Sequence, residues 1–355
     1  MKPIWPRALV SLALLTVIAA CGGTPASSVD VGKASLTGAG ATFPEPFYTK
    51  AFYVYNQTFP QVSVNYQAVG SGAGIQQFTK GTVDFGASDV PMQDADVTAA
   101  GGPSSLVQIP TTLGVVAVAY NLNGIDRLQL DGASLAAIYM GSIKTWNDPA
   151  LAGLNPGVNL PSSAITVVHR SDGSGTTYYF TDYLGKVSSD WKSKVGVGKS
   201  IQWPAGIGGK GNDGVAQTVK QTPGAIGYVE LAYVVQTGMQ QAFLKNKSGK
   251  FVQASVAGAS AAAAQNSSVS PTNFSITDEP GDTTYPIAGF SWIIIRTSIQ
   301  DSQKARAVAY LFKWLVTDGQ AYGKDLQYAS LPTPVQAIAL SGLKQITSGG
   351  SAVLS

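Results

Sequence analysis

The chain has 355 residues, of which 45% are hydrophobic and only 12% charged, so it can bury a large core and is long enough for about two domains. The formal net charge is +3 and falls to +1 if a leader carrying Lys2 and Arg7 is removed, and such a nearly neutral body argues against nucleic acid as a partner. One cysteine and one histidine exclude an intrachain disulfide and a zinc site of cysteines and histidines.

Residues 1–20 are typical of a secretory leader, because a positively charged start precedes the apolar run 8–20, which is too short to span a bilayer comfortably. The end of this run, Ile18-Ala19-Ala20, followed by Cys21, resembles the lipobox of bacterial lipoproteins, in which the cysteine is lipidated and becomes the mature N-terminus. The alternative is an ordinary secretory signal with an incidental cysteine. We expect a lipid anchor at Cys21, followed by a flexible tether over residues 21–34, which are mostly small and polar.

Three glycine-rich turns connect a predicted strand to a predicted helix, and each carries hydroxyl side chains. A helix that begins at such a turn presents its first N–H groups and the positive end of its dipole to an anion. The first turn is not a P-loop, because it lacks Gly-Lys-Ser/Thr. The first turn, 38–44, is followed at helical spacing by Phe47, Ala51, Tyr55 and Phe59. The second turn, 70–74, follows the alternating stretch 62–68 and precedes Ile75 and Phe78. The third turn, 169–177, follows the apolar run 164–168 and precedes Tyr178, Tyr179, Phe180 and Leu184.

The third turn also carries charged side chains. Arg170 offers a planar fork of donors that matches two oxygens of a tetrahedral oxyanion, and Asp172 can hold that fork in place. The same residues also fit an ordinary turn in which Asp172 or Ser174 caps the following helix. His169, the sole histidine, stands beside Arg170 in the strand pattern, which disfavours a Ser-His-Asp triad.

Strands and helices alternate through the rest of the chain, which places it in the α/β class. Asp89 follows one of these strands, and the usual role of an aspartate there is that of a turn residue or helix cap. Strands are predicted at 83–87, 106–109, 115–120, 225–229 and 287–296, and helices around 135–139, 255–265 and 307–315. The glycine-rich stretch 203–214 favours a loop, although its residues Lys210, Asn212 and Asp213 could also line a site.

Six stretches resemble the periplasmic phosphate-binding proteins of bacterial phosphate ABC transporters, and the resemblance extends from Ser35 almost to the C-terminus. It implies a periplasmic-binding-protein fold of type II, with two α/β lobes of mixed sheets and flanking helices joined by a hinge of two strands. The first lobe would comprise 35–116 and 285–355, and the second 117–284. The matching stretches are LTGAGATFP (36–44), VDFGASDVP (83–91), SDGSGT (171–176), GGKGNDG (208–214), PGAIGYVE (223–230) and DLQYASLP (325–332).

The resemblance also implies a set of phosphate ligands. Hydroxyl and N–H groups of this set would donate to phosphate, whereas the carboxylate of Asp89 would accept the proton that phosphate carries and sulfate lacks. A site built this way can reject the analogue without the proton by about 10⁴–10⁵. Gly72, where relatives often have a second serine, and His169 depart from the family pattern without removing a ligand. The implied ligands are Thr42, Phe43, Ser71, Asp89, Arg170, Ser174, Gly175 and Thr176, with Asp172 bracing Arg170.

These observations together predict a monomeric, lipid-anchored receptor in the cell envelope, either periplasmic or otherwise extracytoplasmic. It would bind inorganic phosphate with high affinity and deliver it to the membrane permease subunits of an ABC importer, without a cofactor, a metal or nucleic acid. One alternative is a phosphohydrolase, which would need a metal cluster or an activated nucleophile. Another is a surface or sensing protein on the same fold, and a binder of sulfate or molybdate is the nearest rival within the leading class.

Overall fold

The computed structural model describes Met1 and residues 29–354, so the predicted leader 1–20 and Cys21 lie outside the described residues. The packed chain begins earlier than the sequence indicates. Val31, assigned to the tether, is only 2% exposed, and Ala34 already pairs with Val62. The tether prediction is therefore wrong for its last few residues, because Val31 is apolar and joins the hydrophobic core.

The largest sheet of the described chain has nine strands, and it mixes parallel and antiparallel pairs, as the α/β class predicts. Its order is β2-β1-β3-β12-β4-β8-β6-β7, with β9 paired to β4. Its strands are β1 (Ala34–Gly40), β2 (Val62–Ala68), β3 (Phe85–Ser88), β4 (Leu106–Tyr120), β6 (Thr166–Arg170), β7 (Ile207–Gly209), β8 (Ala225–Glu230), β9 (Gln240–Gln241) and β12 (Ala288–Arg296).

Two parallel groups of strands are joined through the antiparallel strands β4 and β12. Strands β1, β2 and β3 run parallel to one another, and so do β6, β7 and β8. The first part of β4 pairs with β12, and from Val116 onward β4 pairs with β8. The sequence predicted two strands here. The structure has one, because the register of β12 shifts at Ser291 and Trp292, opposite Pro110, whose missing N–H would otherwise interrupt the ladder.

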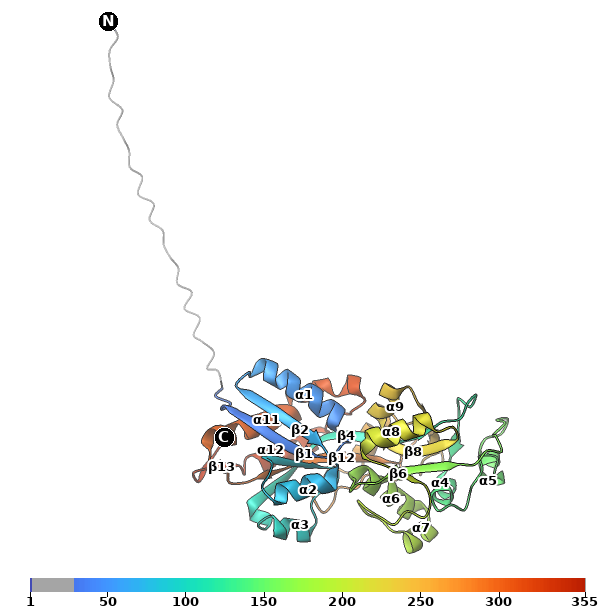
Figure 1. Cartoon of the computed structure of the whole chain (residues 1–355). Helices are drawn as coiled ribbons and strands as arrows, with labels where there is room; N and C mark the ends of the chain where they lie inside the picture. Colours follow the sequence, from blue (N-terminus) through green and yellow to red (C-terminus); the bar gives the residue numbers. More distant parts are fainter. Residues whose placement is uncertain (2–28, 355) are drawn as a thin grey trace. The chain divides into compact units, whose positions relative to one another are not determined.

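Helices cover both faces of this sheet. In the view of Figure 1, α1, α8 and α9 lie above it, and α2, α3, α6 and α7 lie below it. Each amphipathic helix turns its apolar side toward the strands, as in α1, where Phe47, Tyr48 and Tyr55 are buried. The helices are α1 (Glu45–Thr58), α2 (Ser71–Thr79), α3 (Asp94–Ala99), α4 (Gly132–Tyr139), α5 (Pro149–Leu154), α6 (Gly175–Val187), α7 (Ser189–Lys194), α8 (Gly211–Gln221), α9 (Leu231–Thr237), α10 (Val256–Ala263), α11 (Ser302–Val316) and α12 (Thr333–Leu343).

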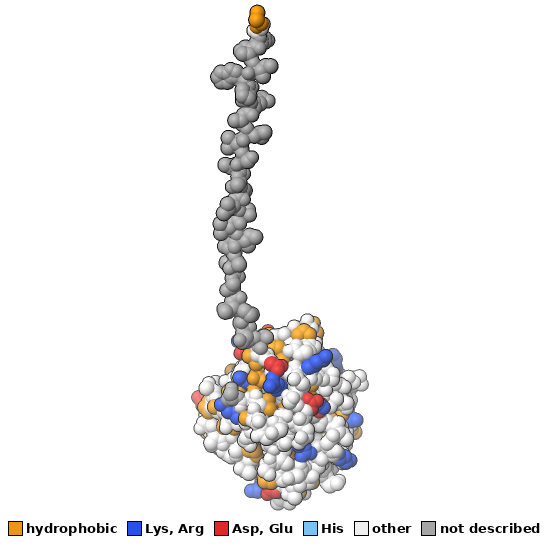
Figure 2. Space-filling view, turned by 90° about the vertical axis from the view of Figure 1, so that its left-hand side faces the viewer, with side chains coloured by type: hydrophobic (Ala, Val, Ile, Leu, Met, Phe, Trp, Pro, Cys, Tyr) orange, Lys and Arg blue, Asp and Glu red, His pale blue; other side chains and the backbone are white. Residues whose placement is uncertain are grey.

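Shorter elements complete the described chain, and no helix within it has the length and apolar character needed to cross a membrane. On the face drawn in Figure 2, basic and acidic side chains are interspersed and most of the surface is uncharged. The shorter elements are β5 (Gln129–Leu130), β10 (Phe243–Lys245), β11 (Phe251–Val252), β13 (Thr347–Ser348) and β14 (Ser351–Ala352), with 3₁₀ turns η1 (Pro103–Ser105), η2 (Asp318–Tyr322) and η3 (Lys324–Leu326).

The predicted loop 203–214 is partly wrong, because it contains strand β7 and the start of helix α8. Gly208 pairs in parallel with His169. A Cβ atom on Gly209 would lie 2.7 Å from the backbone nitrogen of Val215, so only glycine allows this strand to approach the helix that follows it. A dense run of glycines therefore encodes close packing here, which composition alone does not distinguish from an open loop.

Candidate functional site

Four helices begin close together, where carboxyl ends of strands in both parallel groups meet. The hydroxyl of Ser71, at the start of α2, accepts a hydrogen bond of 3.1 Å from the N–H of Gly175, at the start of α6. The amide of Asn212, at the start of α8, donates to Thr42, which precedes α1, at 2.8 Å and to Thr176 at 3.1 Å. The first N–H groups of several helices thus converge on one buried region, an arrangement suited to an anion.

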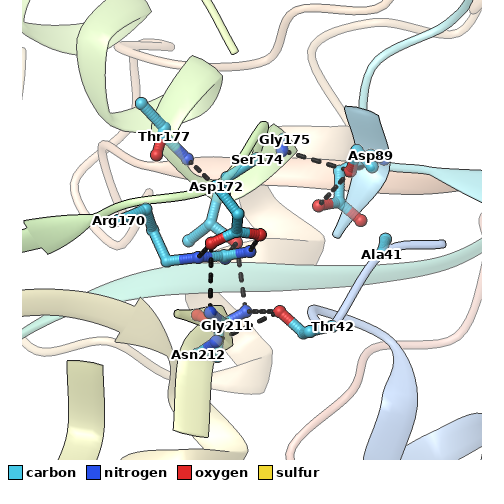
Figure 3. Close-up of polar contacts among 12 residues, drawn as sticks. Ala41, Thr42, Asp89, Arg170, Asp172, Ser174, Gly175, Thr177, Gly211 and Asn212 are labelled. Atoms are coloured by element: carbon cyan, nitrogen blue, oxygen red, sulfur yellow. Dashed lines mark hydrogen bonds and ion pairs between the residues drawn. The ribbon is translucent and has the colours of Figure 1, made fainter. Parts of the chain in front are cut away.

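Arg170 enters this region from the last position of β6, and its side chain is 1% exposed. Its Nε atom donates to Asp172 Oδ1 at 2.8 Å, and its Nη2 atom donates to Asp172 Oδ2 (Figure 3). Asp172 also accepts from the N–H of Gly211 at 3.0 Å. Burial acts to raise the pKa of Asp172, but the hydrogen bonds and charge of Arg170 outweigh it and hold that pKa below its usual value. The guanidinium is therefore fixed by an ionised partner.

Three hydroxyl groups in the site accept hydrogen bonds but donate none within residues 29–354. Thr42 Oγ1 accepts from Asn212, and Thr176 Oγ1 accepts from Arg170 Nη1 at 3.3 Å. Ser174 Oγ accepts from the N–H of Thr177 at 3.1 Å, which makes Ser174 the N-cap of α6. All three hydroxyls are at least 97% buried. Their hydrogens can therefore be given to a bound group without breaking another bond.

Asp89 is the acceptor on the opposite side of the site, at the end of β3, and is 1% exposed. Ser291 donates to its Oδ1 atom and Ser71 to its Oδ2 atom, the latter at 3.4 Å. Burial raises the pKa of Asp89 to about 7, against the hydrogen bond from Ser291, the charge of Arg170 and the hydrogen bond from Ser71. Near neutral pH this carboxyl group can hold or release a proton.

Backbone groups complete the site. The N–H groups of Phe43 and Thr176 have no acceptor among the residues that the structure describes, while the Phe43 ring packs on Tyr328 at a centroid distance of 6.4 Å. A Cβ atom on Gly175 would lie 2.4 Å from Cβ of Asp89, so glycine is needed for this close approach. All eight implied ligands thus lie in or beside one network, in which many donors face the protonatable carboxyl group of Asp89.

Sequence reasoning missed one side chain of this network, that of Ser291, and left a second, that of Asn212, undecided between a site and a loop. Asn212 lies inside the stretch 208–214, but the expectation of a loop hid its position at the start of α8. Ser291 stands alone among apolar residues in β12, and an isolated hydroxyl in a fully buried strand is the signal that could have identified it. His169 turns away from the site and stacks on Trp203 at 4.7 Å, as strand alternation predicts.

The chain is similar in sequence to known proteins over most of its length. A family model for the PBP superfamily domain matches residues 25–318. The phosphate-binding protein PstS of Xylella fastidiosa is 43% identical, over 87% of this chain and 85% of the relative. The phosphate-binding protein PstS of Pasteurella multocida is 46% identical, over 85% of this chain and 87% of the relative.

Solved structures share the fold. A high-affinity periplasmic phosphate-binding protein with bound phosphate has a TM-score of 0.71 at 21% identity, covering 87% of this chain and 93% of its own. A candidate substrate-binding protein of a phosphate ABC transporter from Clostridium perfringens, also with bound phosphate, has a TM-score of 0.62 at 18% identity. The match covers 84% of this chain and 100% of that protein's chain. These likenesses show that the chain shares its fold, a mixed sheet with helices on both faces, with these proteins. The family model and the relatives at 43% and 46% identity show that the chain belongs to the PstS family of phosphate-binding proteins within the PBP superfamily.

Proposed function

We propose that this chain binds inorganic phosphate outside the cytoplasm and delivers it to the membrane subunits of an ABC-type importer. The observation that carries the proposal is the site itself, in which three buried hydroxyls with free hydrogens and Arg170 face the protonatable carboxyl of Asp89. Such a site suits a small tetrahedral oxyanion that carries a proton. Its relatives are named as phosphate-binding proteins, which agrees with that chemistry.

Each residue has a proposed role at the phosphate. The hydroxyl groups donate hydrogen bonds, the backbone N–H groups at the helix starts do the same, and Arg170 pairs with two oxygens while Asp172 holds it. Asp89 accepts the proton of the anion. The proposed donors of hydroxyl hydrogens are Thr42, Ser71, Ser174 and Thr176, and the proposed backbone donors are Phe43, Gly175 and Thr176.

We further propose that the site lies between two lobes, 35–116 with 285–355 and 117–284, which close over phosphate by a hinge motion. Support comes from contacts that join the two segments at the site: Gly72 N–H donates to Gly173 O at 2.9 Å, and Ser71 accepts from Gly175. Strand β4 passes from one segment to the other at Val116, where its partner changes from β12 to β8. In this proposal the structure corresponds to the closed arrangement.

Export and anchoring remain part of the proposal. We expect a monomer held at the membrane by a lipid on Cys21, with its body in the periplasm or outside the cell. The proposal does not include catalysis. The sole histidine stacks on Trp203 instead of facing the site, and no group of three potential metal ligands occurs among the described residues. A phosphohydrolase would need such a base or metal cluster.

The test is isothermal titration of the chain from residue 22 onward, unfolded and refolded to strip any bound ligand. We expect one anion site that binds phosphate far more tightly than sulfate at pH 8. Folded protein that gives no heat with phosphate would refute the proposal. Hydrolysis of a chromogenic phosphate ester by metal-supplemented protein would favour the phosphohydrolase, and normal growth of a deletion strain on limiting phosphate would remove the transport role.

A further inference from the structure

Asn212 is fully buried at the start of α8 and contacts two of the proposed phosphate ligands (Figure 3). Its Nδ2 atom lies 2.8 Å from Thr42 Oγ1 and 3.1 Å from Thr176 Oγ1, and its backbone nitrogen lies 3.1 Å from Thr42 Oγ1. These two threonines stand 134 residues apart in the sequence and come from different helix starts. One amide group therefore connects three segments of the site.

The position of the amide oxygen, Oδ1 of Asn212, determines the direction of these hydrogen bonds. Asn212 Oδ1 accepts a hydrogen bond of 3.0 Å from the backbone N–H of Glu230, so the oxygen of the amide must point there. A flipped amide would place its NH₂ group against that N–H and its oxygen against the threonines. The NH₂ group, with two hydrogens, accordingly donates one to each threonine hydroxyl.

The consequence for the threonine hydroxyls follows from counting. A hydroxyl oxygen accepts two hydrogen bonds and donates one. Thr42 Oγ1 accepts two from Asn212, and Thr176 Oγ1 accepts one from Asn212 and one from Arg170 Nη1. Both oxygens are therefore saturated as acceptors, and each hydroxyl can only act as a donor.

We propose that Asn212 is a positioning residue that locks the hydroxyls of Thr42 and Thr176 as hydrogen-bond donors toward the bound anion. The inference rests on the proposed phosphate function but concerns a residue outside the ligand set. Donors oriented before binding need no reorganisation when the anion arrives, which strengthens binding. A hydroxyl that was free to rotate could instead present its lone pairs to the anion and repel it.

The test is a double-mutant cycle on phosphate affinity, measured on the same chain from residue 22 onward. Asn212→Leu keeps the approximate size of the side chain but removes both donors, and Asn123→Leu is the matched control at an exposed turn. We expect Asn212→Leu to weaken phosphate binding about 10- to 100-fold in the wild-type background. In the Thr42→Val or the Thr176→Val background the loss should be several-fold smaller, because one hydroxyl that Asn212 orients is absent.

An equal loss in all three backgrounds would mean that Asn212 has only a structural role and would overturn the inference, as would no loss at all. Asn212→Asp provides a second variant for the same cycle, because it keeps the acceptor for Glu230 while replacing the donors with an oxygen. If the wild-type chain binds no phosphate, the proposed function fails. If the wild type binds and the cycle shows no coupling, only the role of Asn212 fails.

Discussion

The titration of Asp89 leads to a quantitative prediction about sulfate. Sulfate carries no proton near neutral pH, so it can bind beside this buried carboxyl group only when Asp89 is itself protonated; otherwise two negative groups meet without a hydrogen between them. With a pKa of about 7, the protonated fraction of Asp89 is near nine-tenths at pH 6 and near one-hundredth at pH 9. Sulfate affinity should therefore fall about 100-fold over this range, while phosphate, which retains a proton, stays bound at pH 9.

The perturbation that isolates this effect is Asp89→Asn. The asparagine keeps an oxygen for Ser291 and offers an NH₂ group to the anion at every pH, so its sulfate affinity should not change between pH 6 and 9. The assay is isothermal titration with sulfate, competed by phosphate, at constant ionic strength. Repeating it in buffers of different ionisation enthalpy should show uptake of about one proton per sulfate at pH 8 in the wild type and none in the variant.

Asp126→Asn, at an exposed position, is the matched control and should behave as the wild type does. A wild-type sulfate affinity that is flat from pH 6 to 9 would refute the reasoning, since it would show that the protonation of Asp89 is not linked to the anion. The same slope in Asp89→Asn would assign the linkage to another group.

Three further predictions concern the same site. Arg170→Ala should weaken phosphate binding by about 2–5 kcal/mol in titration, because it removes a buried charged donor and leaves the carboxylate of Asp172 without its partner. The control Arg127→Ala, at an exposed position, should leave phosphate affinity unchanged. Gly175→Ala should displace Asp89 and lower phosphate affinity, whereas Gly153→Ala, where no atom lies within 4 Å of the added carbon, should not. In the ligand-free protein, the raised pKa of Asp89 makes the free energy of unfolding fall as pH rises from 3.8 to about 7. Asp89→Asn lacks this titration, so in denaturant titration its free energy of unfolding relative to the wild type should rise over that range by up to about 4 kcal/mol. A stability difference between the two that does not change with pH would contradict this last expectation.

Local signals in the sequence were sufficient for the elements and for part of the site. The helices that follow the glycine-rich turns were predicted from apolar spacing and are confirmed, and so is the α/β class. The pair Arg170 and Asp172 is two residues apart, so its geometry is largely set by the local turn. The Ser174 N-cap is equally local.

Contacts between segments that lie far apart in the sequence could not be predicted from such local signals. Asn212 meets Thr42 across 170 residues, and Ser291 meets Asp89 across 202 residues. Nothing in the local pattern around Asn212 or Ser291 states which strand ends will meet in the folded sheet. The raised pKa of Asp89 has the same origin, because burial by several remote elements causes it.

The place of β12 in the sheet has a consequence for how the chain is made. β12 stands between β3 and β4, so strands β1 to β3 join the rest of the sheet only after residue 288 has been synthesised. The strands β6 to β9 and the second part of β4 all lie within 116–241 and can pair earlier. The sheet of a newly made chain therefore stays incomplete until about two hundred residues after β3 have been made.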